Sequence, residues 1–341
     1  MKSWILGPDF LRQSPSRADN ISEEDEKRCR RRTAIYMEKA GEHLKFPRLT
    51  IATAQVFFHR FYALQSFKKF RRFDIAVTCL FLAGKVEEYP RKLESVIQMC
   101  HQIWNKLDKP TLNPDSQDYE FLRLTILRTE RQILHTIAFD LCVKHPYKDL
   151  IDTVKKLHQA GLIEEKQKRE FAQSALNFLN DSMRTSICLQ FEPKKIASAT
   201  IYLATVYMNM NKPEENPDWM KKLEINHQEL ASICEQIMEV YVLTLKDEPS
   251  KNNMDQKNSK MHNLRSQLVR SGYVPESTHN SHGSTIKHGK RSGNNFRRTA
   301  TPSDEKISKD MEEDRASKKA RNAYAGILPH GQVRPAAPLS P

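Results

Sequence analysis

The chain has 341 residues, of which 38% are hydrophobic and 28% charged, and its formal net charge is +13. This length predicts about two domains, and the modest hydrophobic content predicts an additional polar segment that does not fold. Because residues 246–341 alone carry a net charge of +8, the basic excess lies mostly in the tail, and we expect no direct sequence-specific nucleic-acid binding by the folded part.

Helical spacing of apolar residues dominates the chain from residue 22 to residue 245, whereas the alternation typical of strands is hard to find. We therefore predict an all-α fold. The segment 74–88 is apolar on nearly every side, which is typical of a helix at the centre of a bundle. After an N-terminal extension (residues 1–21), we expect a first domain at 22–141, with helices at 22–44, 49–66, 74–88, 92–106 and 117–137.

A faint internal repeat indicates that this domain is duplicated. Ile75–Ala83 aligns with Ile196–Ala204 at an offset of 121 residues, and both segments combine small and apolar residues. Such self-similarity predicts two five-helix units in tandem. The second unit is predicted to span 142–246, with helices at 145–159, 164–184, 193–209 and 227–246.

The tail, residues 247–341, is rich in Ser, Asn and Lys and nearly free of aromatic residues. It is predicted to be disordered, because so little apolar surface does not offset the entropy of ordering the chain. Lys287–Arg298 and Lys318–Arg321 are short basic clusters of the type that nuclear import receptors bind, which predicts a nuclear protein. Solvated charge on a disordered chain explains the clusters equally well.

Motifs that carry enzyme chemistry or bind a metal or cofactor are missing from the sequence. There is no Gly-rich phosphate loop, no zinc-type Cys/His spacing and no nucleophile motif. The most tempting general base, His59, lies on an apolar helix, where a hydrogen-bonded core histidine is the more common case. The six cysteines are not clustered, so we expect mostly buried, reduced thiols. We expect no catalytic activity, cofactor, metal, signal peptide or membrane span.

A group of ordered motifs gives the sequence a specific resemblance. Leu80–Glu88 reads LFLAGKVEE; it follows His59–Tyr62 (HRFY), and Glu130–Leu134 (ERQIL) comes further along the chain. These blocks resemble the cyclin box over about residues 4–245. Ser14–Arg17 (SPSR) is typical of the transcription branch, cyclins T and K, and several blocks are nearer to cyclin K. The chain lacks the long Pro-rich tail and the paired tryptophans that cyclin K leads us to expect.

The resemblance implies a kinase-binding surface on the first box. By match to the family's motif, Lys85 corresponds to the lysine that contacts the kinase, and Glu130 to its glutamate companion. An intramolecular ion pair between the two is the structural alternative and is compatible with that role. The other positions that match the family's contact surface are Leu82, Val86, Glu88, Leu134, Phe139 and Leu141. The last three are equally suited to the core.

The function that this resemblance implies is activation of a transcription-type cyclin-dependent kinase. Such a kinase phosphorylates the carboxy-terminal domain of RNA polymerase II and promotes elongation, so the polymerase is an indirect partner. The alternatives are a cell-cycle or splicing-associated cyclin, or a DNA-binding initiation factor of the TFIIB type. The last would need an N-terminal zinc ribbon and basic helices, which the sequence lacks.

Overall fold

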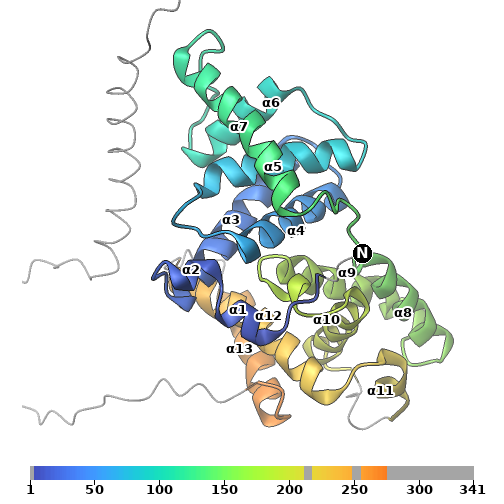
Figure 1. The fold of residues 1–341 in the computed structure, drawn as a ribbon. Helices are drawn as coiled ribbons and strands as arrows, with labels where there is room; N and C mark the ends of the chain where they lie inside the picture. The colour runs from blue at the N-terminus through green and yellow to red at the C-terminus, as the bar shows by residue number, and fades with distance from the viewer. Residues whose placement is uncertain (1–3, 211–216, 248–254, 275–341) are drawn as a thin grey trace, which may run out of the picture. The chain divides into compact units, whose positions relative to one another are not determined.

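The computed structural model describes residues 4–210, 217–247 and 255–274, and the rest of the chain, including both basic clusters of the tail, lies outside the described residues (Figure 1). Within the described ranges the regular structure is helical, as the sequence predicts. No helix in these ranges is long and apolar enough to cross a membrane.

The first box is a bundle of five helices around α5. Ser22 caps the N-terminus of α3 and Ser116 that of α7. Each side chain accepts a hydrogen bond from the backbone N–H three residues on, which satisfies a free donor of the first turn. Helix α5 is buried on most sides, as its apolar sequence predicts. The helices are α3 (Glu23–His43), α4 (Arg48–Leu64), α5 (Arg72–Val86), α6 (Leu93–Trp104) and α7 (Gln117–Thr136).

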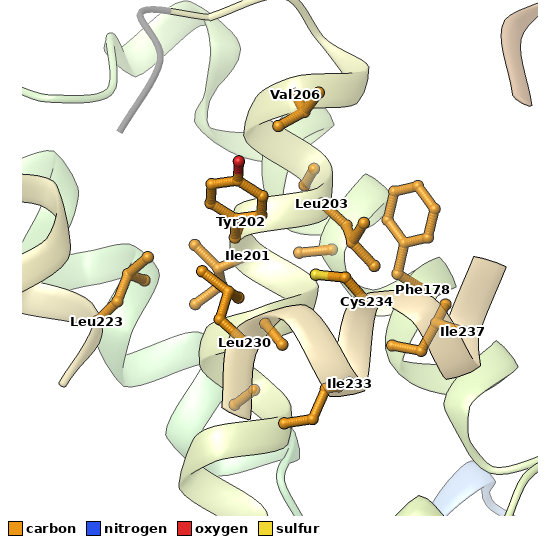
Figure 2. Packing of buried hydrophobic residues seen from close by; sticks show 14 of the residues in the cluster. Phe178, Ile201, Tyr202, Leu203, Val206, Leu223, Leu230, Ile233, Cys234 and Ile237 are labelled. Carbon is orange, nitrogen blue, oxygen red and sulfur yellow. The ribbon is translucent and has the colours of Figure 1, made fainter. Parts of the chain in front are cut away.

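The second box repeats this arrangement around α10. Tyr202 and Leu203 of α10 pack against Leu230 and Cys234 of α12, with Phe178 of α9 beside them (Figure 2). A short helix, α11, completes the five; the sequence pattern did not indicate it. The helices are α8 (Tyr147–Gln159), α9 (Glu165–Ser182), the 3-10 turn η1 (Ile187–Leu189), α10 (Pro193–Tyr207), α11 (Pro217–Leu223) and α12 (His227–Asp247).

An additional helix, α13 (Asp255–Arg270), corrects the predicted end of the folded part. Met261, Leu264 and Leu268 are buried in the core of the second box, as are Tyr273 and Val274. The expectation that the chain is disordered from residue 247 is therefore wrong for 255–274. The polar composition of the segment hid three apolar residues spaced i, i+3 and i+7, which form one face of a helix.

The N-terminal extension is packed against both boxes through two short helices, α1 (Pro8–Arg12) and α2 (Pro15–Ala18). The buried Ser14 hydroxyl donates to Glu26 of α3 at 2.6 Å, and Leu6 N–H donates to the Leu189 carbonyl of the second box at 2.7 Å. Through these contacts the N-terminal extension packs on the two boxes.

A buried polar network joins the two boxes. Arg30 pairs with Glu26 at 2.8 Å, donates to the Tyr62 carbonyl at 2.9 Å, and lies 3.3 Å from His59 Nδ1. On its other side, His59 Nε2 donates to the Met183 carbonyl of the second box at 3.0 Å. Burial, aided by the Arg30 charge, lowers the pKa of His59 to about 3, so this histidine is neutral and has a core role.

All six cysteines are free thiols, and their positions follow the prediction only in part. Cys79, Cys100 and Cys234 are buried, and burial raises the pKa of Cys100 to about 12. Cys142 is exposed, contrary to expectation, because the connector after α7 runs along the surface. A thiol with an elevated pKa is a poor nucleophile, so the buried cysteines serve packing.

Candidate functional site

The candidate site is a seam between the C-terminal half of α5 and the middle of α7. Lys85 Nζ lies 2.5 Å from Glu130 Oε1, and the Lys85 side chain remains 43% exposed while that of Glu130 is 13% exposed. The same ammonium lies 4.5 Å from the centroid of the Phe81 ring. An aromatic face and a carboxylate thus hold one cation in place while it still faces solvent. A pair this exposed contributes little to folding, about 0–1 kcal/mol.

Helix α5 ends in a Schellman motif that fixes the position of Glu88. Tyr89 N–H donates to the Gly84 carbonyl at 2.8 Å, and Glu88 N–H to the Lys85 carbonyl at 3.4 Å. Glu88 takes a φ of 62°, a left-handed conformation that a side chain tolerates poorly. At Gly84, a Cβ would come within 3.0 Å of the Phe46 ring, so glycine allows this close packing.

Helix α7 ends in the same motif, and this ending exposes an aromatic ring. Phe139 N–H donates to the Leu134 carbonyl at 2.8 Å, and Ala138 and Phe139 both have positive φ, 53° and 57°. Phe139 is 59% exposed, and its ring packs edge-on against His135. An aromatic ring this exposed is a common feature of binding surfaces.

The remaining predicted residues line the seam at different depths. Val86, Leu134 and Leu141 are half-buried and pack on the core of the first box. Leu82 is only 4% exposed and belongs to that core. The structure therefore brings Lys85 and Glu130 into direct contact, whereas Leu82 supports the seam from below.

Two residues that the sequence did not single out hold the junction beside Phe139. Arg60 of α4 donates to the Asp140 carbonyl at 2.9 Å, and the Arg60 guanidinium lies 4.8 Å from the Trp4 ring. Trp4 Nε1 donates in turn to the Asp140 carboxylate at 3.1 Å. No local pattern connects these positions, because the contacts join segments far apart in the chain. The cation–π pair of Phe81 and Lys85 was detectable from its i, i+4 spacing.

The chemistry of the site suits binding. Among the described residues, no group of three or more His, Cys, Asp or Glu side chains is arranged to hold a metal ion. The seam combines a fixed cation, a carboxylate and apolar side chains on two rigid helices. Such a surface can recognise a partner with complementary charge and apolar groups.

Comparison with known families identifies the fold. The family described as "Cyclin, N-terminal domain" matches residues 10–142, and "Cyclin, C-terminal domain" matches residues 149–271. The chain belongs to the cyclin family. Members of this family are regulatory, non-catalytic subunits. The second match reaches past α12 into α13, in agreement with the burial of that helix.

The relatives of this cyclin include cyclins of the T type, and solved structures share its fold. It is 38% identical to cyclin-T1-5 of Arabidopsis thaliana over 70% of this chain and 41% of the relative. It is 31% identical to cyclin pch1 of Schizosaccharomyces pombe over 75% of this chain and 73% of the relative. The fold resembles a chain of the yeast RNA Pol II CTD kinase CTDK-1 complex, with a TM-score of 0.61 and 16% identity, covering 80% of this chain and 86% of that one.

Coverage differs among these relatives. The chain spans less than half the length of cyclin-T1-5, whereas it spans nearly three quarters of cyclin pch1.

Proposed function

We propose that this cyclin is the activating subunit of a cyclin-dependent kinase that phosphorylates the carboxy-terminal domain of RNA polymerase II and promotes elongation. The observation that supports it most directly is the seam, where Lys85 is fixed by Glu130 and Phe81 yet remains 43% exposed. Val86, Leu134 and Leu141 pack half-buried on the core of the same box, Leu82 belongs to that core, and Phe139 is exposed after α7.

Such a surface activates a kinase without supplying a reacting group. A protein kinase needs its strand lysine paired with a glutamate on a mobile helix before the phosphates and Mg²⁺ are aligned. A partner that binds the helix better in its active position shifts the equilibrium towards that state. The seam suits this task because both of its helices end in fixed backbone motifs, so its charges keep their places when the partner binds.

The polymerase domain as substrate is suggested by the names of similar proteins. The relatives include a cyclin of the T1 type, and the similar fold in the CTDK-1 complex comes from a kinase of the polymerase carboxy-terminal domain. We propose the same substrate class and a nuclear location for this cyclin. A nearer relationship to cyclin K than to cyclin T stays a prediction.

Affinity purification of the tagged chain tests the partner directly. We expect a cyclin-dependent kinase to co-purify and the isolated complex to phosphorylate peptides of polymerase repeats, while the kinase without the cyclin is inactive. Mass spectrometry identifies the kinase, and labelled phosphate measures its activity. Depleting the cyclin from cells is expected to lower polymerase phosphorylation and the transcription of long genes before the cell-cycle distribution changes. Arrest at one division stage with polymerase phosphorylation unchanged contradicts this proposal.

The tail is expected to affect how long the complex stays on its substrate. Residues 279–341 carry a net charge of +6, and the substrate becomes anionic as phosphates accumulate. A chain ending at residue 278 keeps α13 and is expected to retain activity. It should add about two- to threefold fewer phosphates per binding event at low salt, because a basic arm raises the local concentration of its anionic product.

Salt separates this electrostatic effect from a role in folding. The difference between the full and shortened chains should disappear at about 0.5 M salt, where charge interactions over more than a few ångströms are screened. A full-length variant with the Lys and Arg residues of 279–341 changed to Gln is the matched control, and it should behave like the shortened chain. Equal processivity of all three at low salt shows that the tail has no such role.

A further inference from the structure

The C-terminal helix α13 lies on the second box at a place that has a counterpart in the first. Its residues Met261, Leu264 and Leu268 are buried in the core of the box. The helix, drawn in orange in Figure 1, contacts both α10 and α12. After α13, Tyr273 stacks on His227 with ring centroids 4.4 Å apart and tilts against Tyr202 at 4.8 Å. The helices α10 and α12 correspond to α5 and α7, which form the candidate kinase seam.

The backbone gives this correspondence residue by residue. Helix α10 ends in the same Schellman motif as α5, since Met210 N–H donates to the Thr205 carbonyl at 3.1 Å and Asn209 N–H to the Val206 carbonyl at 3.1 Å. Asn209 has a φ of 50°, in the position that Glu88 holds in the first box. Counted from the same motif, Val206 stands where the first box has Lys85.

Helix α13 lies at both of these equivalent positions. Val206 is 7% exposed and lines a hollow of about 340 Å³ together with Leu264 and Arg270. Gln267 of α13 donates to the Asn209 side chain at 3.2 Å. The position that matches Glu88 is therefore hydrogen-bonded to a helix of the chain itself, and the position that matches Lys85 lines a hollow beside that helix.

The second box is also chemically adapted to an apolar helix. Where the first box presents an ammonium and a carboxylate, the second presents an isopropyl group and a neutral amide. Helix α13 matches this face with aliphatic side chains at i, i+3 and i+7. A hollow remains on each side of α13. One is lined by Val206 and Leu264, as above, and the other by Glu235 of α12 and Arg270 of α13, so the helix fills the face only in part.

We propose that the α10/α12 face of the second box is a helix-binding site equivalent to the candidate kinase seam, and that α13 is its ligand in cis. The comparison with a kinase seam rests on the proposed function; the binding of α13 does not. The ligand class is an amphipathic helix with aliphatic residues at i, i+3 and i+7, followed by an aromatic residue. A partner helix of this pattern competes with α13, whose attachment to the same chain gives it a high effective concentration.

The experiment uses the full chain with a specific protease site placed in residues 248–254. After cleavage, we expect fragment 255–341 to stay bound to residues 1–247 during size-exclusion chromatography. With Leu264→Asp and Leu268→Asp, we expect fragment 255–341 to dissociate from residues 1–247. A fluorescent peptide of residues 255–274 should then bind the emptied face. Fluorescence anisotropy should give saturable binding, weakened at least tenfold by the same two substitutions in the peptide or by Val206→Lys in the box.

Controls make the outcome decisive. Asn263 of α13 is exposed, so a peptide with Asn263→Asp should bind within twofold of the unchanged peptide. If the emptied chain keeps its helical circular dichroism but does not bind the peptide, the proposal is wrong. It is also wrong if release of the fragment unfolds the second box, because α13 is then a fixed part of that core. Kinase binding measured on the same samples tests the first box separately. If the peptide binds but the kinase does not, only the proposed function is contradicted.

Discussion

Lys85→Glu is expected to lower the affinity for the partner kinase at least ~100-fold, equivalent to about 2.7 kcal/mol. The ammonium is held by Glu130 and the Phe81 ring and faces solvent, where a partner built for a cation would contact it. Reversing a charge that becomes buried at an interface removes an attraction and adds a repulsion, which together typically cost 2–5 kcal/mol. Surface plasmon resonance with the purified kinase measures the change, and thermal unfolding measures the stability of the free cyclin.

A charge swap separates recognition from folding. Lys85→Glu places two carboxylates side by side, whereas Lys85→Glu with Glu130→Lys restores an ion pair of opposite polarity. We expect the double variant to regain the unfolding temperature of the unchanged chain but not its kinase affinity. Lys155→Glu is the matched control, since Lys155 is an exposed, ion-paired lysine of the second box. Recovery of kinase binding by the double variant shows that the pair is only structural.

The helices of the two boxes were predictable because the spacing of their apolar residues matches the helical period. Segments with a continuous apolar face, such as 74–88, begin and end within about two residues of the predicted bounds. Among the helices that the sequence did not predict, α11 and α13 were missed for different reasons. Helix α11 is a short segment anchored by the buried Trp219, too brief to show a period. In α13 the buried face is only one aliphatic residue per turn, and the composition of the surrounding tail concealed it.

The candidate site was predictable only through the resemblance to cyclins. Nothing local in the sequence indicates that Lys85 meets Glu130, because the packing of α5 on α7 makes that contact. The exposure of Phe139 depends on two successive left-handed residues, and neither Ala138 nor Phe139 is of a type that favours this conformation. The network of Trp4, Arg60 and Asp140 likewise requires the folded chain.

The free energy of unfolding is expected to fall by about 4 kcal/mol between pH 7 and pH 5, a large share of the 5–15 kcal/mol typical of a domain. Burial lowers the pKa of His59 to about 3 and that of His145 to about 4, with nearby Arg30 and Arg60 adding to the effect. In the unfolded chain both imidazoles have a pKa near 6.5.

The sign follows from proton binding. Above pH 6.5 both imidazoles are neutral in the folded and in the unfolded chain, so their titration does not change the free energy of unfolding. Below pH 6.5 the unfolded chain takes up protons that the folded chain excludes, and each histidine lowers the stability by about 1.4 kcal/mol per pH unit until its folded pKa is reached. At pH 5 each histidine has lowered the free energy of unfolding by about 2 kcal/mol. Urea unfolding at pH 7.5, 6.5, 5.5 and 5.0 measures the total loss.

Substitution assigns the effect to these two groups. His59→Gln keeps an N–H for the Met183 carbonyl, and His145→Gln keeps one for the Thr53 hydroxyl, 2.7 Å from the imidazole in the native chain. Each variant is expected to be less stable at pH 7.5 but to lose only about half as much stability on acidification, and the double variant should be nearly insensitive between pH 7 and pH 5. His135→Gln, at an exposed position on α7, should leave the full pH dependence in place. An unchanged slope in the double variant would show that other groups destabilise the fold in acid, because two neutral amides exchange no protons in this range.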